Sequence, residues 1–222
     1  MGVLAGLAMG ALLIVAPPAH ALLITPTFTA SITGNANAAA IEGAITTAIN
    51  TIDGLYSNPV TIPVRFTYYN DGSTIASTTE SYYYPSYDTY VNLLRADSLA
   101  NPENTVLATA IANLAEGNDA NGARNMAVVG AQLTMLGITA APDATINLNS
   151  VWGPYSSFTT AVTSSQIDAI GGLEHELDEV LGGGGGGSGM NLFYDLEYGP
   201  TDLYRYSAPG TPSYTMSSGA SS

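Results

Sequence analysis

The chain has 222 residues, which is enough for one domain with a sizeable buried core. Its 18 acidic residues and only 4 basic residues, all arginine, give a formal net charge of −14. Nucleic acid and anionic membrane surfaces are therefore excluded as expected partners, because neither would be attracted to such a chain. Cysteine is absent, so a disulfide framework and a thiolate metal site are also excluded.

The N-terminal segment has the pattern of an export signal. Residues 2–16 are almost wholly apolar, and they are followed by Pro17-Pro18 and the small-x-small sequence Ala19-His20-Ala21. The pattern predicts a signal peptide over residues 1–21, cleavage after Ala21, and a secreted mature protein. The apolar run is short for a membrane span, and a short N-terminal anchor helix is the alternative. No basic residue precedes the run, which is consistent with a true start further upstream.

The chain then predicts a strand, a helix and a second strand. Residues 22–31 are rich in Thr, Ile and Phe, which favours a strand. Asn35 or Asn37 can cap the helix that follows. Residues 60–69 alternate apolar and polar side chains as a strand does, and Pro63 favours an edge position or a strand start. The helix has one apolar face, formed by Ile41, Ile45, Ile49 and Ile52.

The middle of the chain predicts a hairpin and three helices. Asn70-Asp71-Gly72 is a turn signal, after which residues 73–84 are expected to return as the second half of a hairpin. Ser86 can cap a helix that runs to Leu99, and further helices are predicted over 104–115 and 123–136. The inward positions of the first two helices are predicted to be Tyr90, Val91, Leu94, Leu99, Val106, Ile111 and Leu114.

The last part of the regular pattern is a strand followed by a helix. Residues 145–152 alternate as a half-exposed strand does. Ser164 or Ser165 can cap a helix that begins near Gln166, with Asp168 in its first turn. The order of elements predicts an α/β or α+β fold in which helices cover a twisted sheet.

The domain is expected to span residues 22–210. Residues 190–194 are predicted to form a short strand. Residues 211–222 are rich in Ser, Gly and Pro and are expected to be a disordered tail at a C-terminal truncation.

The most informative motif lies in the final helix, where residues 171–182 read Gly-Gly-Leu-Glu-His-Glu-Leu-Asp-Glu-Val-Leu-Gly. His175 and Glu179 are one turn apart on the same face, so an imidazole nitrogen and a carboxylate oxygen can reach one metal ion at about 2 Å. Glu176 follows the histidine, as the general base does in His-Glu-x-x-His proteases, where it acts on metal-activated water. His20 falls in the predicted signal peptide, so His175 is the one imidazole of the mature chain.

The same helix has a purely structural interpretation. Its acids can form a solvated face, with the apolar residues Leu173, Leu177, Val180 and Leu181 packed against the core. However, four acids crowd the C-terminal half of the helix, where the macrodipole disfavours anions, and no Lys or Arg is near them in sequence. A bound metal ion would supply the cation that the helix lacks.

Two blocks resemble a family of secreted bacterial proteins assigned as metalloproteases, which carry a His-Glu-Ile-x-Glu-Val-Met/Leu-Gly signature. The first block is Glu174 to Gly182, and the second is Asp202-Leu-Tyr-Arg-Tyr-Ser-Ala-Pro-Gly210, which is similar to the family's Asp-Leu-Phe-Arg-Tyr-Ser-Ala-Pro-Gly segment. Residues 37–68, an Ala-rich helix and the following strand, also resemble the corresponding N-terminal block of this family. The resemblance implies a metzincin-like zinc-protease fold: a twisted mixed sheet, covering helices, an active-site helix, and an edge strand that pairs with extended protein or peptide substrate.

The resemblance also implies roles for single residues. His175 is implied as a zinc ligand, Glu176 as the catalytic general base, Glu179 as the second ligand and Gly182 as the turn glycine. Metzincins place a third ligand three residues past that glycine, where this chain has Gly185.

The third zinc ligand is therefore open. Asp202 is the first candidate because it opens the second matching block, and Asp195 and Glu197 are the alternatives. Met216 is a weak candidate for the methionine turn. Family members continue past the Ser-Ala-Pro-Gly block, which implies that this chain is C-terminally truncated.

The sequence thus predicts a secreted zinc-dependent metallopeptidase, with residues 145–152 as the substrate-pairing edge strand. The alternative is a non-catalytic extracellular or cell-surface protein that keeps the fold and uses the helix structurally. A serine hydrolase is not supported, because no Gly-x-Ser-x-Gly elbow is present.

Overall fold

The computed structural model describes residues 22–56, 58–69, 76–114, 125–140, 144–149, 156–157, 163, 166–183, 197–204, 206–208 and 211–212. The predicted signal peptide, the turn at residues 70–72, the strand at 190–194 and most of the predicted tail lie outside these residues.

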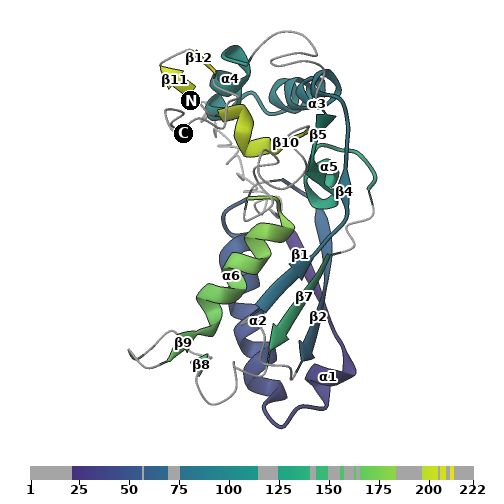
Figure 1. Cartoon of the computed structure of the whole chain (residues 1–222), viewed down its shortest axis with the longest axis vertical. Helices are drawn as coiled ribbons and strands as arrows, with labels where there is room; N and C mark the ends of the chain where they lie inside the picture. The colour runs from purple at the N-terminus through teal and green to yellow at the C-terminus, as the bar shows by residue number, and fades with distance from the viewer. Residues whose placement is uncertain are drawn as a thin grey trace, which may run out of the picture.

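A four-stranded mixed sheet forms the framework of the molecule (Figure 1). Its order is β1-β2-β7-β3, in which β1 (Leu23–Phe28), β2 (Thr61–Tyr69) and β7 (Ala144–Asn149) are parallel. Strand β3 (Ala76–Thr79) pairs antiparallel with β7 and forms one edge of the sheet, opposite β1. Parallel neighbours need crossover connections, and α2 (Ala38–Asp53) supplies the one between β1 and β2.

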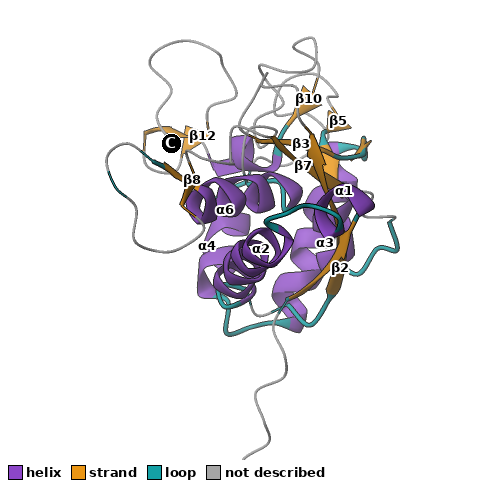
Figure 2. Ribbon diagram, turned by 90° about the horizontal axis from the view of Figure 1, so that it is seen from below, coloured by secondary structure: helices purple, strands orange, loops and turns teal. Residues whose placement is uncertain are grey.

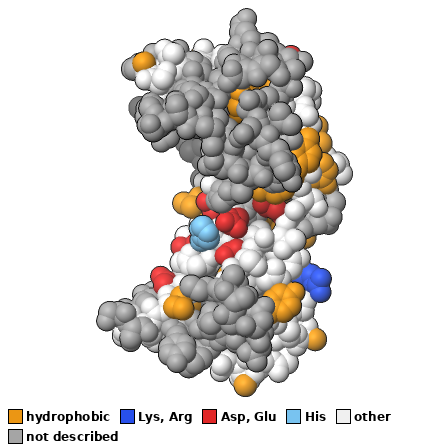
Figure 3. Space-filling model, in the orientation of Figure 1, with side chains coloured by type: hydrophobic (Ala, Val, Ile, Leu, Met, Phe, Trp, Pro, Cys, Tyr) orange, Lys and Arg blue, Asp and Glu red, His pale blue; other side chains and the backbone are white. Residues whose placement is uncertain are grey.

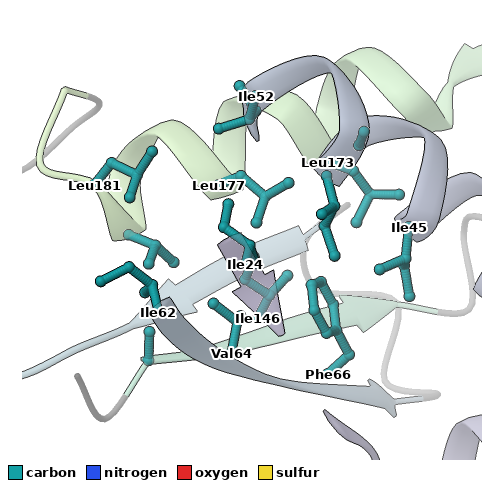
Figure 4. Close-up of a cluster of buried hydrophobic side chains, with 14 of the residues drawn as sticks. Ile24, Ile45, Ile52, Ile62, Val64, Phe66, Ile146, Leu173, Leu177 and Leu181 are labelled. Atoms are coloured by element: carbon teal, nitrogen blue, oxygen red, sulfur yellow. The ribbon is translucent and has the colours of Figure 1, made fainter. Parts of the chain in front are cut away.

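Two long helices, α2 and α6 (Ala169–Val180), pack against each other beside the sheet, as Figure 2 shows. Alternate residues of β2 point toward them, so Ile62, Val64 and Phe66 are buried while Thr61, Pro63 and Arg65 are exposed. We call this unit of β1, β2, β3, β7, α2 and α6 the sheet region. Figure 4 shows its core, which includes Ile24, Ile45, Ile52, Ile62, Val64, Phe66, Ile146, Leu173, Leu177 and Leu181.

A second hydrophobic cluster gathers around α3 (Tyr87–Ala100), α4 (Thr105–Ala112) and the 3-10 helix η2 (Pro200–Tyr204). We call this unit, with its short strands β5 (Asn125–Met126) and β10 (Glu197–Tyr198), the helical region. Its buried residues are Tyr87, Tyr90, Val91, Leu94, Leu114, Met126, Val128, Leu133, Tyr198 and Leu203.

The two clusters meet at β6 (Val128–Val129) and α5 (Gly130–Met135), whose residues are divided between them. The remaining elements are α1 (Ala30–Thr33), β4 (Tyr82–Tyr83), β8 (Ser156–Ser157), β9 (Ile167–Asp168), β11 (Tyr206–Ala208) and β12 (Thr211–Pro212). The prediction of helices on a mixed sheet is confirmed at this level.

Two predictions about strand pairing were wrong. Strand β7 was expected at the edge as part of residues 145–152, yet it lies between β2 and β3. The expected hairpin between residues 60–69 and 73–84 does not form, since β3 pairs with β7 and not with β2. Pro63 is tolerated inside the sheet because the pairing of β2 with β7 begins at Val64, so that only β1 is paired at Pro63.

The segment predicted as a helix over residues 123–136 is helical only in its second half. Of its described residues, 125–126 and 128–129 form the short strands β5 and β6, and α5 is the helical part. Two apolar side chains predicted to be buried are instead exposed, Leu99 at 84 % and Val106 at 79 %. Ser86 caps α3 as predicted, since its Oγ accepts a hydrogen bond from Thr89 N at 3.2 Å.

Candidate metal and catalytic site

Helix α6 carries the candidate site and starts at a strong cap. The Oδ1 atom of Asp168 accepts hydrogen bonds from Ile170 N at 3.1 Å and Gly171 N at 3.0 Å, which satisfies two of the free amides of the first turn. Asp168 is therefore the N-cap and not a first-turn residue as predicted, while Ser164 and Ser165 lie outside the described residues.

The helix ends in a Schellman motif at Gly182. The Gly182 amide donates to Glu179 O at 2.8 Å, and the Gly183 amide donates to Asp178 O at 2.9 Å. Gly182 has φ +81, a left-handed conformation that favours glycine. A Cβ at this position would also collide with the side-chain amide of Gln132 in α5. The predicted turn glycine thus ends α6 where it contacts α5.

His175 and Glu179 lie together on the outer face of α6, as their spacing predicts. The Nε2 atom of His175 is 3.4 Å from Oε1 of Glu179, and their side chains are 63 % and 23 % exposed. Figure 3 shows the histidine among acidic side chains on one face of the molecule. At metal–ligand distances near 2 Å, two ligand atoms of a tetrahedral ion lie about 3.3–3.5 Å apart. The pair therefore fits two neighbouring ligand positions of one zinc ion.

Glu176 points the other way, toward the edge strand. Its side chain is only 6 % exposed, and Thr78 Oγ1 of β3 lies 2.7 Å from its Oε2 and 3.1 Å from its carbonyl oxygen. Burial raises the pKa of the Glu176 carboxyl, and the negative charge of Glu179 raises it further, against the lowering effects of the Thr78 hydrogen bond and His175. A carboxylate with a raised pKa is better suited to accept a proton in catalysis.

Glu80, between β3 and β4, is a part of this site that the sequence did not indicate. Burial raises the pKa of its carboxyl to about 7, the hydrogen bond from Tyr82 lowers it and the charge of Glu179 raises it. Its Oε1 accepts from the Tyr82 hydroxyl at 2.9 Å, and its Oε2 is buried without a hydrogen-bond partner among the described residues. Glu80 follows a Ser- and Thr-rich strand far from α6 in sequence, so no motif marks it.

The third predicted ligand is not brought to the pair. Asp202 is fully buried in η2 of the helical region, where its Oδ2 accepts from Gly199 N at 2.8 Å. Among the residues that the structure describes, no three His, Cys, Asp or Glu side chains form a group that could hold a metal ion. The alternative Asp195 lies outside the described residues, and Glu197 begins β10 with an undescribed side chain. Two of the three predicted ligands are thus together.

Within α6, His175 is the one side chain that can carry a positive charge beside the acids of the helix. The last turn of α6 contains no basic residue, although the helix dipole there favours one. One imidazole and one carboxylate are donor types that zinc accepts in catalytic sites, which have three protein ligands. His175 and Glu179 therefore supply two of the three donors, and the third is unassigned.

No family model, no curated protein and no solved structure matches this chain. The metalloprotease resemblance of the two blocks consequently stays a prediction. Across the described ranges, no helix has both the length and the apolar character required to cross a membrane.

Proposed function

We propose that the chain is a secreted, zinc-dependent metallopeptidase with a metzincin-like fold. The observation that carries the proposal is the 3.4 Å approach of His175 Nε2 to Glu179 Oε1 on a helix that ends at a left-handed glycine. The spacing agrees with two ligand positions of one tetrahedral zinc ion. The two matching sequence blocks support the same assignment.

His175 and Glu179 would hold the ion, and its third protein ligand is unassigned. When bound, zinc polarises a carbonyl group and lowers the pKa of water. Glu176 is placed one residue from the first ligand, and its raised pKa suits a base that takes a proton from water and returns it to the leaving amine.

Strand β3 replaces residues 145–152 as the proposed substrate strand. It forms one edge of the sheet, it packs beside α6, and its Thr78 contacts the proposed base. An extended peptide that adds to this edge would run past Glu176, with its backbone hydrogen-bonded to β3.

A second function is favoured by the surroundings of Glu176. Its carboxyl group is buried and hydrogen-bonded to Thr78, so it can act as a structural tie between α6 and β3. A non-catalytic extracellular or cell-surface protein would need this tie and no metal.

Metal analysis and two matched substitutions separate the functions. The purified chain, kept free of chelators, is expected to hold close to one equivalent of zinc, while His175→Ala holds less than about 0.1 equivalent. Glu176→Gln should keep the zinc and lose at least about 100-fold in peptide hydrolysis, since it removes the base. Glu174→Gln makes an equal change of charge on the same helix and should change neither the zinc content nor the rate of peptide hydrolysis.

A zinc-free wild-type protein would overturn the proposal and support the structural tie. Unchanged peptidase activity in Glu176→Gln would remove Glu176 as the base.

A further inference from the structure

Helix α4 is apolar, but none of its residues is buried. Its sequence is Thr-Val-Leu-Ala-Thr-Ala-Ile-Ala, and the side chain of Val106 is 79 % exposed. A helix that is apolar all round is normally covered on most sides. One side of α4 faces α3, and another borders a cavity that the helical region forms together with Tyr56 and Asn58, which follow α2.

This cavity has a volume of about 360 Å³ and a lining that is mostly aromatic and aliphatic. The lining includes the rings of Tyr56, Tyr90 and Tyr204 and the side chains of Leu94, Leu107 and Leu136. Small-molecule sites have volumes of roughly 300–1,000 Å³ and are mainly apolar with a few polar groups. The cavity lies within that range.

The polar groups of the cavity include one acid, Asp97, and the side-chain amides of Asn58, Asn104 and Gln132. It adjoins a second hollow of about 390 Å³ that shares Asp97 and Asn104 with it and adds Glu103. Asp97 Oδ1 accepts from Asn101 Nδ2 at 2.9 Å, and neither acid has an ion pair with an arginine of the described residues. Gln132 lines the first hollow, and its Oε1 is buried without a hydrogen-bond partner among these residues.

We propose that this cleft binds an amphipathic cation, an ammonium or guanidinium group attached to an aromatic or aliphatic body. The body would occupy the apolar hollow, and the cation would lie beside Asp97, where both the carboxylate and nearby tyrosine rings favour positive charge. The ligand is either a free amine or a basic side chain of a peptide. The site uses α3, α4 and α5, not the outer face of α6, so it does not depend on the peptidase proposal.

Calorimetric titration of the full chain with three ligands of similar shape tests the charge preference. Tryptamine is cationic, 3-ethylindole is neutral and indole-3-propionate is anionic. We expect tryptamine to bind most tightly and indole-3-propionate most weakly. Equal affinity for all three, or no binding by tryptamine, would overturn the proposal.

Substitutions then locate the site. Asp97→Asn should weaken tryptamine binding about fivefold, because it removes one partly exposed charge. The affinity for 3-ethylindole should stay unchanged. Glu42→Gln makes the same change of net charge on α2, away from the cleft, and should leave tryptamine binding unchanged. An equal loss in both variants would show attraction to the overall net charge and would contradict the site.

A second variant tests the cleft even if Asp97→Asn fails to fold. Leu107→Arg places a positively charged side chain at a half-buried position of α4. Because this charge repels a cationic ligand, tryptamine affinity should fall more than about tenfold. Unchanged affinity would contradict the proposal. A blocked Ala-Arg-Ala peptide that competes with tryptamine would assign the ligand to peptide side chains, and tryptamine binding without competition would assign it to free amines.

Discussion

The sheet region and the helical region are held together in different ways. In the sheet region, β1 and β2 pair over all six residues of Leu23–Phe28, and α2 and α6 both bury side chains against the sheet. In the helical region, β5 and β10 pair over only two residues, α4 buries none of its side chains and a cavity of about 360 Å³ remains. The regular unit fixes the position of the His175 helix, and the less regular unit leaves a hollow unfilled.

The largest expected effect tests this contrast in packing. Leu177→Ala removes a fully buried side chain between α6 and the sheet and should lower the free energy of unfolding by about 3 kcal/mol. Leu107→Ala, in the half-buried position of α4, should cost less than about 1 kcal/mol because little buried volume is lost. Urea unfolding measures both, and equal costs would mean that the two regions are packed alike.

The next effect concerns the contact between the regions at Gly182. Gly182→Ala should destabilise the protein by about 2 kcal/mol, because alanine is strained at positive φ and its Cβ meets Gln132. Gly43→Ala is the control, since this exposed position in α2 has nothing within 4 Å of an added Cβ. It should stabilise the helix by up to about 1 kcal/mol. A Gly182→Ala protein as stable as the wild type would contradict the left-handed turn.

A smaller effect follows from Glu80, whose pKa is raised in the folded state. Folding favours the neutral form of the Glu80 carboxyl. The contribution of this group to the free energy of unfolding is therefore complete below about pH 4.5 and is lost as the pH rises to about 7. With a chelator present, the free energy of unfolding of Glu80→Gln should therefore exceed that of the wild type by about 1.5 kcal/mol at pH 8, allowing for partial exposure of the carboxyl. At pH 4 the two should be equal. Glu103→Gln, an equal charge change at an exposed site, is the control. A pH-independent difference would contradict the raised pKa.

The smallest effect asks whether the regions unfold together. Ser86→Ala in the helical region and Asp168→Ala in the sheet region each remove a side-chain cap and should each cost about 1 kcal/mol. If the regions form one cooperative unit, each change moves the whole unfolding curve. Two separate transitions, only one of which responds to each substitution, would show independent regions.

Local patterns predicted some elements well and others badly. Helix α2 follows from isoleucines on one face, and Ser86 follows from cap chemistry, because both depend only on neighbours in sequence. The apolar residues between Met126 and Leu136 fit helical spacing equally well, but Val128 and Val129 pair with β4 and become strands. Tertiary pairing overrode the periodicity there.

The same limit applies to the site. The approach of His175 to Glu179 could be predicted, since helix geometry alone brings positions i and i+4 together. The positions of Glu80 and Thr78 could not be predicted, because both depend on the pairing of β3 with β7, which lies far along the chain. Alternation along β7 indicates a half-buried strand but not how many strands flank it.

The strand order also has a consequence for the time course of folding. Ser77 of β3 and Asn147 of β7 are 70 residues apart in sequence, and β7 separates β3 from β2. During synthesis at roughly 5–20 residues per second, β3 must therefore wait several seconds for the strand it pairs with. Thr78 reaches Glu176 only once α6 has been made as well. The nascent chain thus completes the wall of the candidate site among its last events, after the β1–α2–β2 unit has had time to form.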